Sequence, residues 1–259
     1  MHVRPRVGAV VALLLPVTAA ADLVFVGEAR TIDGKQLLYR ELHHVTAPGT
    51  ARERQVVLYQ CPDSAAIFAR KELDFSRTRR EAPLFELIDA RLGYTEGVRM
   101  LPGGRLQVFT KPGAKYAERN ALLPAGKAIV MDAGFDEFVR MRWAELEARR
   151  SVKFSFLVPS RMHAIDFRIS RHHDIDIAGE PAAVIRLNLS GFLGWFLPYI
   201  DVAYRKSDRL LLRYTGLSNM RDLAGDNLNV RIDFPPALRR AQPVDLEQLR
   251  AVPLLNRCP

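Results

Sequence analysis

Short runs of alternating apolar and polar residues are the feature that most constrains how this chain folds. The cleanest run is "NLNVRIDFPP", in which Leu228, Val230, Ile232 and Phe234 face one way and the residues between them face the other. Pro235–Pro236 ends the run, because proline cannot donate a hydrogen bond to a neighbouring strand. A period of two is typical of a β-strand with one buried face, so the chain is predicted to be rich in strands.

The same alternation recurs along most of the chain and is interrupted by turn residues. "AIDFRIS" repeats it, and three hairpins are predicted with turns at Gly103–Gly104, Gly179–Glu180 and Lys206–Asp208. The first half carries less regular candidate strands. These are Leu23–Ala29, Gln36–His44, Gln55–Gln60, Ile67–Phe75, Thr95–Met100 and Leu106–Thr110.

One segment, "DAGFDEFVRMRWAELEARR", has the spacing of a helix over residues 132–150. Asp132 is expected to cap its N-terminus. Its apolar stripe packs against a sheet as ordinary core or lines a ligand cavity, and both interpretations stay open. The stripe consists of Phe135, Phe138, Val139, Trp143 and Leu146. Weaker helices are expected over Tyr116–Leu122 and Val244–Leu249.

Together these patterns predict a mainly β protein. About a dozen antiparallel strands would form a curved sheet or an incompletely closed barrel, with the 132–150 helix packed on it as a lid or plug. Such a sheet must close or be covered, because exposed edge strands invite aggregation. We expect residues 22–259 to form a single β-rich domain.

The N-terminus has the pattern of a secretory signal peptide. Arg4 and Arg6 precede the apolar run Val7–Val17, and small residues follow in Thr18–Asp22. The run is too short for a stable membrane anchor, and cleavage is expected after Ala21. The protein is therefore predicted to be periplasmic or secreted. The alternative is that this run forms an N-terminal core strand.

The interpretation of the two cysteines, Cys61 and Cys258, depends on whether the protein is exported. In an oxidising compartment they are expected to form a disulfide that fastens the C-terminal tail to an early strand. The chain-entropy model gives such a long loop a stabilisation of about 4–5 kcal/mol. Two unpaired thiols are the alternative, because sequence does not define the distance between them.

The charge of the chain argues against nucleic acid as a partner. The formal charge of +9 falls to +7 when Arg4 and Arg6 are removed with the signal peptide. The densest basic cluster is Arg77–Glu81, and no basic block is interleaved with aromatic residues. A basic exported protein is compatible with anionic lipid headgroups or other polyanions.

Candidate catalytic and metal-binding motifs are weak. In "RHHDID" an extended strand would place His172, Asp174 and Asp176 on one face, which is a plausible ligand set. The flanking isoleucines indicate instead that this face is solvated. "GLSN" (Gly216–Asn219) is typical of a turn and does not match the nucleophile-elbow motif. No metal, cofactor or catalytic residue is therefore expected.

The stretch "LSGFLGWFLPYIDV" (Leu189–Val202) is unusually apolar for a connection between two hairpins. It is free of charge from Gly191 to Ile200 and too short and too interrupted to cross a membrane. Three interpretations stay open: a helix that plugs the end of the barrel, the lip of a ligand cavity, or a patch that contacts membrane or a partner.

Four segments of the second half resemble a group of exported proteins of Gram-negative bacteria. The segments are "DAGFDEFVRMRWAEL", "FSFLVPSR", "IDVAYRKSDRLLLRYTGLSNMRD" and "NLNVRIDFPP", within Ala128–Pro236. The order of elements also looks like the periplasmic lipoprotein-carrier fold of the LolA and LppX type. That resemblance implies a curved, incompletely closed sheet around a helical lid, which binds lipid, acyl chain or lipoprotein without chemistry. No functional residue of that family is transferred to this chain.

The sequence therefore predicts a periplasmic, non-catalytic binding module for a hydrophobic small molecule or lipid, with transient contact to membrane or envelope protein. The expected ligand-binding residues are the aromatic and apolar side chains of the two segments above. They are Phe192, Leu193, Trp195, Phe196, Tyr199, Phe135, Phe138 and Trp143. The first alternative is an envelope structural or interaction protein with a filled core, and the second is a metal-dependent hydrolase.

Overall fold

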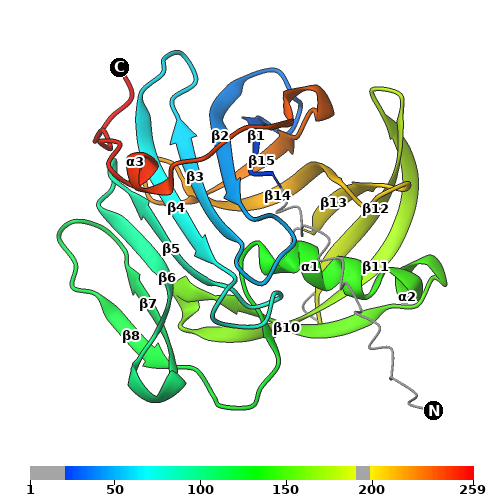
Figure 1. Ribbon diagram of the computed structural model, residues 1–259, viewed down its shortest axis with the longest axis horizontal. Coiled ribbons are helices and arrows are strands. Elements are labelled where there is room, and N and C mark those ends of the chain that lie inside the picture. The colour runs from blue at the N-terminus through cyan, green and yellow to red at the C-terminus, as the bar shows by residue number, and fades with distance from the viewer. Residues whose placement is uncertain (1–20, 191–198) are drawn as a thin grey trace, which may run out of the picture.

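A computed structural model describes residues 21–190 and 199–259. These residues form one sheet of sixteen strands that curves strongly without closing (Figure 1). The predicted fold class, a mainly β protein with a curved antiparallel sheet and few helices, is confirmed. None of the helices within the described residues has the length and apolar character needed to cross a membrane.

Two antiparallel meanders make up the sheet. The first runs in chain order from β1 to β8, and the second from β10 to β15. Their strands are β1 Leu23–Arg30, β2 Leu37–Thr46, β3 Arg54–Gln60, β4 Ile67–Asp74, β5 Leu84–Asp89, β6 Tyr94–Met100, β7 Leu106–Lys111, β8 Arg119–Leu122, β10 Val152–Val158, β11 His163–Ile177, β12 Glu180–Leu189, β13 Ile200–Arg205, β14 Leu211–Arg221 and β15 Asn227–Asp233. β1 pairs with β15, for example Glu28 with Asp233, and this pairing joins the two meanders.

Short elements complete the chain. β9 (Ile129–Val130) pairs in parallel with β10, and β16 (Arg240–Ala241) pairs with the start of β1. The helices are α1 (Gly134–Met141), α2 (Trp143–Glu147) and α3 (Leu246–Arg250). Sixteen strands exceed the dozen expected. β8, β9 and β16 are too short to show an alternation, β5 and β10 were not predicted, and β11 is one strand where two were expected.

The single helix predicted over residues 132–150 is wrong in detail. The chain forms α1 and α2 with a break at Arg142, whose φ of −98° and ψ of 9° leave the helical region. A continuous helix would carry Arg142 into the buried stripe, whereas the break leaves its side chain in solvent beside Glu145. Asp132 does not cap the helix: Ala133 occupies the cap position without a side-chain hydrogen bond.

The two weaker helix predictions had opposite outcomes. The segment Tyr116–Leu122 is not helical, because Arg119–Leu122 pairs with β7 as strand β8, and this tertiary pairing overrides local propensity. The C-terminal helix is present at Leu246–Arg250. The Asp245 side chain caps it by accepting hydrogen bonds from the amides of Glu247 and Gln248 at 3.0 and 3.1 Å.

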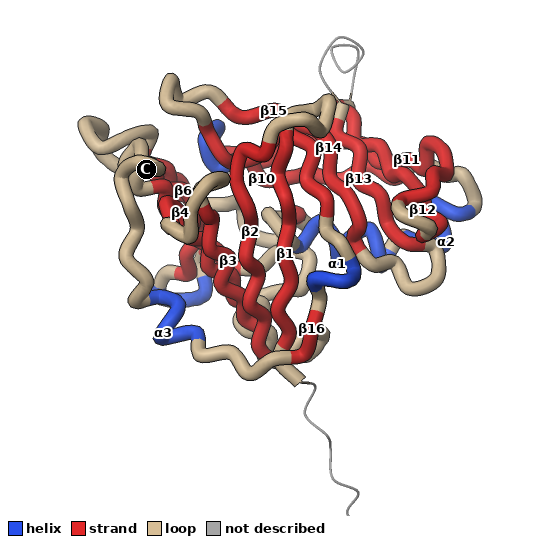
Figure 2. The backbone as a smooth tube through the Cα atoms, turned by 90° about the horizontal axis from the view of Figure 1, so that it is seen from above, coloured by secondary structure: helices blue, strands red, loops and turns tan. Residues whose placement is uncertain are grey.

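The helices lie on opposite faces of the sheet. α1 and α2 pack on the concave face of β10–β13 (Figure 1), where Phe138, Val139 and Trp143 join a cluster with Ile185 and Tyr204. α3 and the following tail pack on the other face beside β3 (Figure 2). We call these the inner and the outer face.

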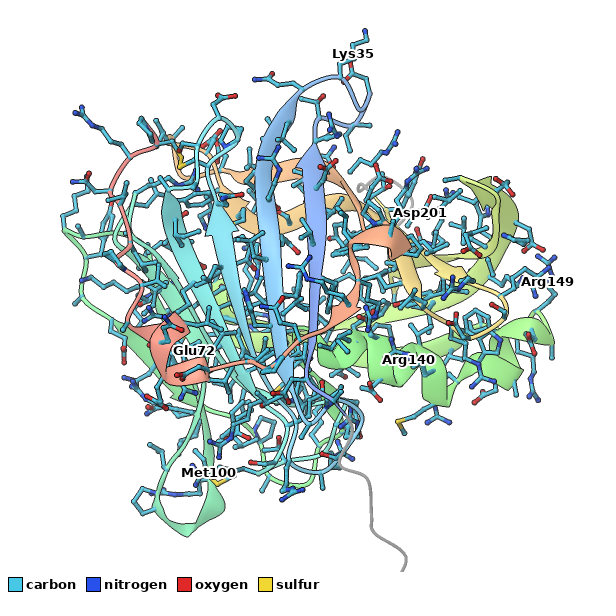
Figure 3. All side chains as sticks on the ribbon, turned by 45° about the horizontal axis from the view of Figure 1, so that its top comes forward. Lys35, Glu72, Met100, Arg140, Arg149 and Asp201 are labelled. Atoms are coloured by element: carbon cyan, nitrogen blue, oxygen red, sulfur yellow. A yellow bond between two sulfur atoms is a disulfide. The ribbon has the colours of Figure 1, made fainter. Side chains whose placement is uncertain are left out.

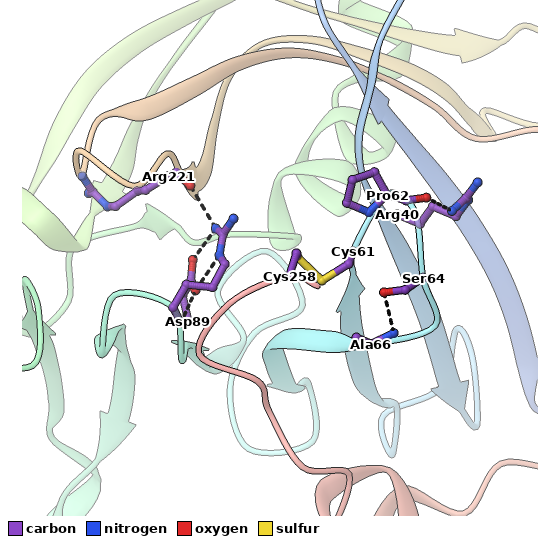
Figure 4. Close-up of a disulfide and its surroundings, with 9 residues drawn as sticks. Arg40, Cys61, Pro62, Ser64, Ala66, Asp89, Arg221 and Cys258 are labelled. Carbon is purple, nitrogen blue, oxygen red and sulfur yellow. Dashed lines mark hydrogen bonds and ion pairs between the residues drawn. A yellow bond between two sulfur atoms is a disulfide. The ribbon is translucent and has the colours of Figure 1, made fainter.

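A disulfide between Cys61 and Cys258 fastens the C-terminal tail to the end of β3 (Figure 4), as predicted. It links residues 197 positions apart with a Cα–Cα distance of 5.6 Å. The tail also buries apolar side chains against the outer face, including Leu246 and Leu249 against Val56. The sheet therefore carries a covalently held strap on its outer side.

Candidate functional site

The predicted ligand-binding residues do not all come together. Phe135, Phe138 and Trp143 lie on α1 and α2 against the inner face. Phe192, Leu193, Trp195 and Phe196 lie outside the described residues. Tyr199 is 49% exposed, and its ring stacks with the guanidinium of Arg186 at 3.7 Å. Arg186 lies between Ile185 and Leu187, which contact the helices, so the ring of Tyr199 lies apart from Phe135, Phe138 and Trp143.

Five phenylalanine rings gather beneath α1, and we call them the phenylalanine cluster. Its members are Phe135 and Phe138 on α1, Phe154 and Phe156 on β10, and Phe167 on β11. Neighbouring ring centroids are 4.7 to 6.4 Å apart, in tilted and edge-to-face arrangements that aromatic pairs prefer.

Exposure distinguishes this cluster from the rest of the core. Phe138 is 7% exposed, but the other four rings are only partly buried. By contrast, Trp143 is 3% exposed, and its indole meets the ring of Tyr204 edge-on with centroids 6.2 Å apart. The α2 end of the helical segment is therefore a filled core, whereas at the α1 end the described residues leave four of the five rings partly exposed.

Three carboxylates hold α1 and its leading turn to the sheet and its loops. Asp132 accepts from Lys71 of β4 at 2.7 Å, and Asp136 accepts from the hydroxyl of Tyr204 at 2.6 Å. Glu137 pairs at 3.1 Å with Arg80, which lies in the loop between β4 and β5. The acidic residues of "DAGFDE" thus attach the start of the helix to both meanders.

Backbone packing tightens the same attachment. The amide of Met131 donates to the carbonyl of Glu81 at 2.9 Å. A Cβ atom at Gly134 would lie 2.4 Å from that carbonyl, so only glycine allows the first turn of α1 to approach so closely. The N-terminal turn of α1 therefore packs directly against the backbone of the loop that carries Arg80.

Ionisable side chains also line the inner face of the first meander. Glu41 lies 3.0 Å from the His43 ring, and Lys71 binds Asp132, all with side chains 10–13% exposed. Burial alone would lower the pKa of Lys71, but the Asp132 and Glu41 carboxylates outweigh it and the pKa is raised. The charged interior of this meander is a poor environment for a hydrocarbon chain.

Glu96 is the most perturbed carboxyl of this network. Burial raises its pKa to about 7, although the hydroxyl of Tyr94 donates a hydrogen bond to it at 2.6 Å. Sequence reasoning missed Glu96 and Lys71. A signal was present, since each occupies the inward phase of its strand: Glu96 between Tyr94 and Val98, and Lys71 two residues before the buried Leu73.

The weak metal motif does not assemble. Among the described residues, no group of three or more histidine, cysteine or acidic side chains is placed to hold a metal ion. A bulge between Arg171 and Asp174 breaks the alternation that would align His172 with the two aspartates. Hydrogen bonds from Arg171 and Lys206 lower the pKa of Asp174 to about 2, so this carboxylate already has cationic partners.

Comparison with known proteins gives distant structural matches alone. No family model and no curated protein matches the chain. A β-barrel-like protein of a domain of unknown function, DUF1849, from Brucella abortus matches at 9% identity, with a TM-score of 0.42 over 86% of this chain and 98% of that one.

Two further solved structures are similar at the same 9% identity. One is a domain named for outer membrane lipoprotein sorting from Vibrio parahaemolyticus, with a TM-score of 0.28 over 86% of each chain. The other is a DUF1329 family protein from Desulfovibrio piger, with a TM-score of 0.26 over 87% of each chain. The first of these two is of the lipoprotein-sorting type that the sequence resembles. At TM-scores below 0.5, these likenesses carry no argument about ligand or mechanism.

Proposed function

We propose that this chain is an exported, non-catalytic binding protein for an apolar ligand such as a lipid or an acyl chain. The ligand would contact the phenylalanine cluster at the α1 end of the helical segment. The charged network of the first meander would hold α1 in place and would not itself contact hydrocarbon.

The partial exposure of four clustered phenylalanine rings is the observation that supports this proposal best. Burying a phenylalanine side chain fully stabilises a protein by about 1.5–3 kcal/mol, so several rings left partly in water forgo part of that energy. Scattered apolar side chains on a surface are ordinary, but rings in mutual contact at a helix–sheet junction form a contiguous surface that fits an apolar partner.

Export is supported by two independent features. The N-terminal sequence has the charged, apolar and small-residue order of a signal peptide. The Cys61–Cys258 disulfide is typical of an oxidising compartment, since cytosolic proteins keep such thiols reduced. An envelope location brings the protein close to lipid.

A second candidate function is that of a structural or interaction protein of the envelope. The filled core around α2 favours it, because Trp143 and Leu146 are 3% and 1% exposed and leave no room for a ligand there. In this case the phenylalanine cluster would contact another protein and not a small molecule.

Native mass spectrometry and solvent extraction of the purified mature protein separate these candidates. We expect copurifying lipid or, after delipidation, saturable binding of a fluorescent fatty acid. Phe156→Ala and Phe167→Ala should each weaken that binding about tenfold or more, which is the loss expected for about 1.5 kcal/mol of apolar contact. Tyr116→Ala is the matched control, because Tyr116 is an exposed aromatic residue (51%) outside the cluster. Absence of lipid and of fatty-acid binding would refute the proposal.

A further inference from the structure

The outer face of the first meander contains a groove that the proposed function does not use. Its volume is about 490 Å³, within the range of small-molecule sites. One wall is formed by Arg250 of α3, and the groove extends across β4, β5 and β6 to Met100. Figure 3 shows Glu72 beside α3 and Met100 near the turn that follows β6.

The floor of the groove follows one row of cross-strand neighbours. Glu72 of β4 is opposite Glu86 of β5, which is opposite Gly97 of β6, which is opposite Phe109 of β7. Because Gly97 has no side chain, the Phe109 ring can lie against the strand; a Cβ atom there would be 2.9 Å from the ring. The Phe109 ring is 3% exposed, and the guanidinium of Arg99 lies 4.7 Å from its centroid.

Two like charges face each other in this row. Glu72 and Glu86 are direct cross-strand partners, and Arg70 and Arg250 pair with Glu72 at 3.2 and 2.7 Å. Desolvation and the Glu72 carboxylate together raise the pKa of Glu86.

Most charges of the groove neutralise one another. Arg250 pairs with Glu72 at 2.7 Å, and Arg54 with Asp74 at 3.8 Å. Arg99 pairs at 2.5 Å with Glu118, which lies outside the groove.

One cation and one anion of the groove lining remain without an ion pair. Within the described residues Glu86 has no ion pair or side-chain hydrogen bond, and the side chain of Arg77 has no ion pair and one hydrogen bond, to the sulfur of Met100 at 3.4 Å.

From this remainder we infer that the groove binds a small zwitterion that carries a primary ammonium and an anionic group, for which phosphoethanolamine is the probe. The ammonium would donate to the carboxylate of Glu86, and the phosphate would accept from the guanidinium of Arg77. The carbon linker would lie beside the side chain of Met100. This site is on the face opposite to the phenylalanine cluster and does not depend on ligand binding there.

Calorimetric titration with O-phosphoethanolamine tests the inference. We expect saturable binding, and at least about tenfold weaker binding of both ethanolamine and glycerol 3-phosphate, because each lacks one of the two charged groups. Equal binding of the three compounds, or no binding of phosphoethanolamine at millimolar concentration, would overturn it.

Variants locate the site. Glu86→Gln should weaken phosphoethanolamine binding about tenfold or more while leaving glycerol 3-phosphate binding unchanged, and Arg77→Gln should weaken both. Arg105→Gln, at an exposed position, and Glu145→Gln, at a half-exposed position, are charge-matched controls outside the groove and should bind as the wild type does. Unchanged binding by the Glu86 and Arg77 variants would contradict the assignment.

Cosedimentation with lipid vesicles distinguishes a lipid headgroup from a free zwitterion as the ligand of the groove. Cosedimentation with vesicles that contain phosphatidylethanolamine, lost in Glu86→Gln, would assign the groove to a lipid headgroup. Binding of soluble phosphoethanolamine without cosedimentation would assign it to a free zwitterion. Both results support the shared chemistry, and cosedimentation that is identical for wild type and Glu86→Gln would exclude a role of the groove at the vesicle surface.

Discussion

Replacement of Glu96 by glutamine should make the protein more stable at alkaline pH and leave its stability at pH 4.5 almost unchanged. Glu96 is 6% exposed on β6, and burial raises its pKa from the ordinary value of 4.5 to about 7. Glutamine keeps an oxygen that can accept the hydrogen bond from Tyr94, but it carries no charge to desolvate.

The sign of the effect follows from proton linkage. Between pH 4.5 and pH 7 the folded protein retains a proton on Glu96 that the unfolded chain releases, so the free energy of unfolding falls as the pH rises. The contribution is complete below pH 4.5 and lost above pH 7. The difference between the two pKa values corresponds to about 3 kcal/mol.

Urea denaturation of wild type and Glu96→Gln at several pH values between 4.5 and 8.5, with the disulfide intact, measures this difference. The stabilisation by Glu96→Gln should grow from near zero to about 3 kcal/mol across that range. Glu118→Gln, which removes a half-exposed ion pair with Arg99, should change stability by less than about 1 kcal/mol at every pH. A difference between wild type and Glu96→Gln that does not vary with pH would refute the reasoning.

Three further predictions concern stability. Reduction of the disulfide should lower the free energy of unfolding by about 2–5 kcal/mol, measured by urea denaturation with and without reductant. Lys71→Met should lower the free energy of unfolding by about 3–5 kcal/mol, because it leaves the Asp132 carboxylate buried without its cation. The double variant Lys71→Met with Asp132→Asn should lose less. A double-mutant cycle in which the losses of the two single variants simply add would contradict this ion pair. Leu146→Ala, at a 1% exposed position, should cost about 2–5 kcal/mol by thermal denaturation, whereas Met141→Ala, at 61% exposure, should cost less than about 0.5 kcal/mol.

The candidate site could be predicted only in part. Helical spacing identified Phe135 and Phe138 as members of one apolar stripe, and both lie in the phenylalanine cluster. The three rings from β10 and β11 were not predicted as part of it, although their alternation was visible. Strand periodicity predicts which side chains share a face of the sheet, but it does not predict which helix will cover that face.

By itself, the sequence determined the local elements. The alternation in "NLNVRIDFPP" and its two prolines define β15, and the pair Cys61 and Cys258 defines the disulfide. The turn residues define the hairpin at Lys206–Asp208 and the hairpin between β11 and β12, whose turn is Ala178–Gly179, one residue before the predicted position. These features depend on neighbours along the chain, or on the presence of only two cysteines, so local patterns are sufficient to predict them.

The tertiary structure decided everything that depends on contacts between distant segments. Pairing with β7 turned Arg119–Leu122 into a strand where the local sequence favours a helix, and packing on the sheet divided one predicted helix at Arg142. The Lys71–Asp132 pair and the raised pKa of the buried Glu96 carboxyl also arise only when the sheet curves around α1. Burial, desolvation and ion pairing are properties of three-dimensional proximity, which the spacing of residues in one segment does not contain.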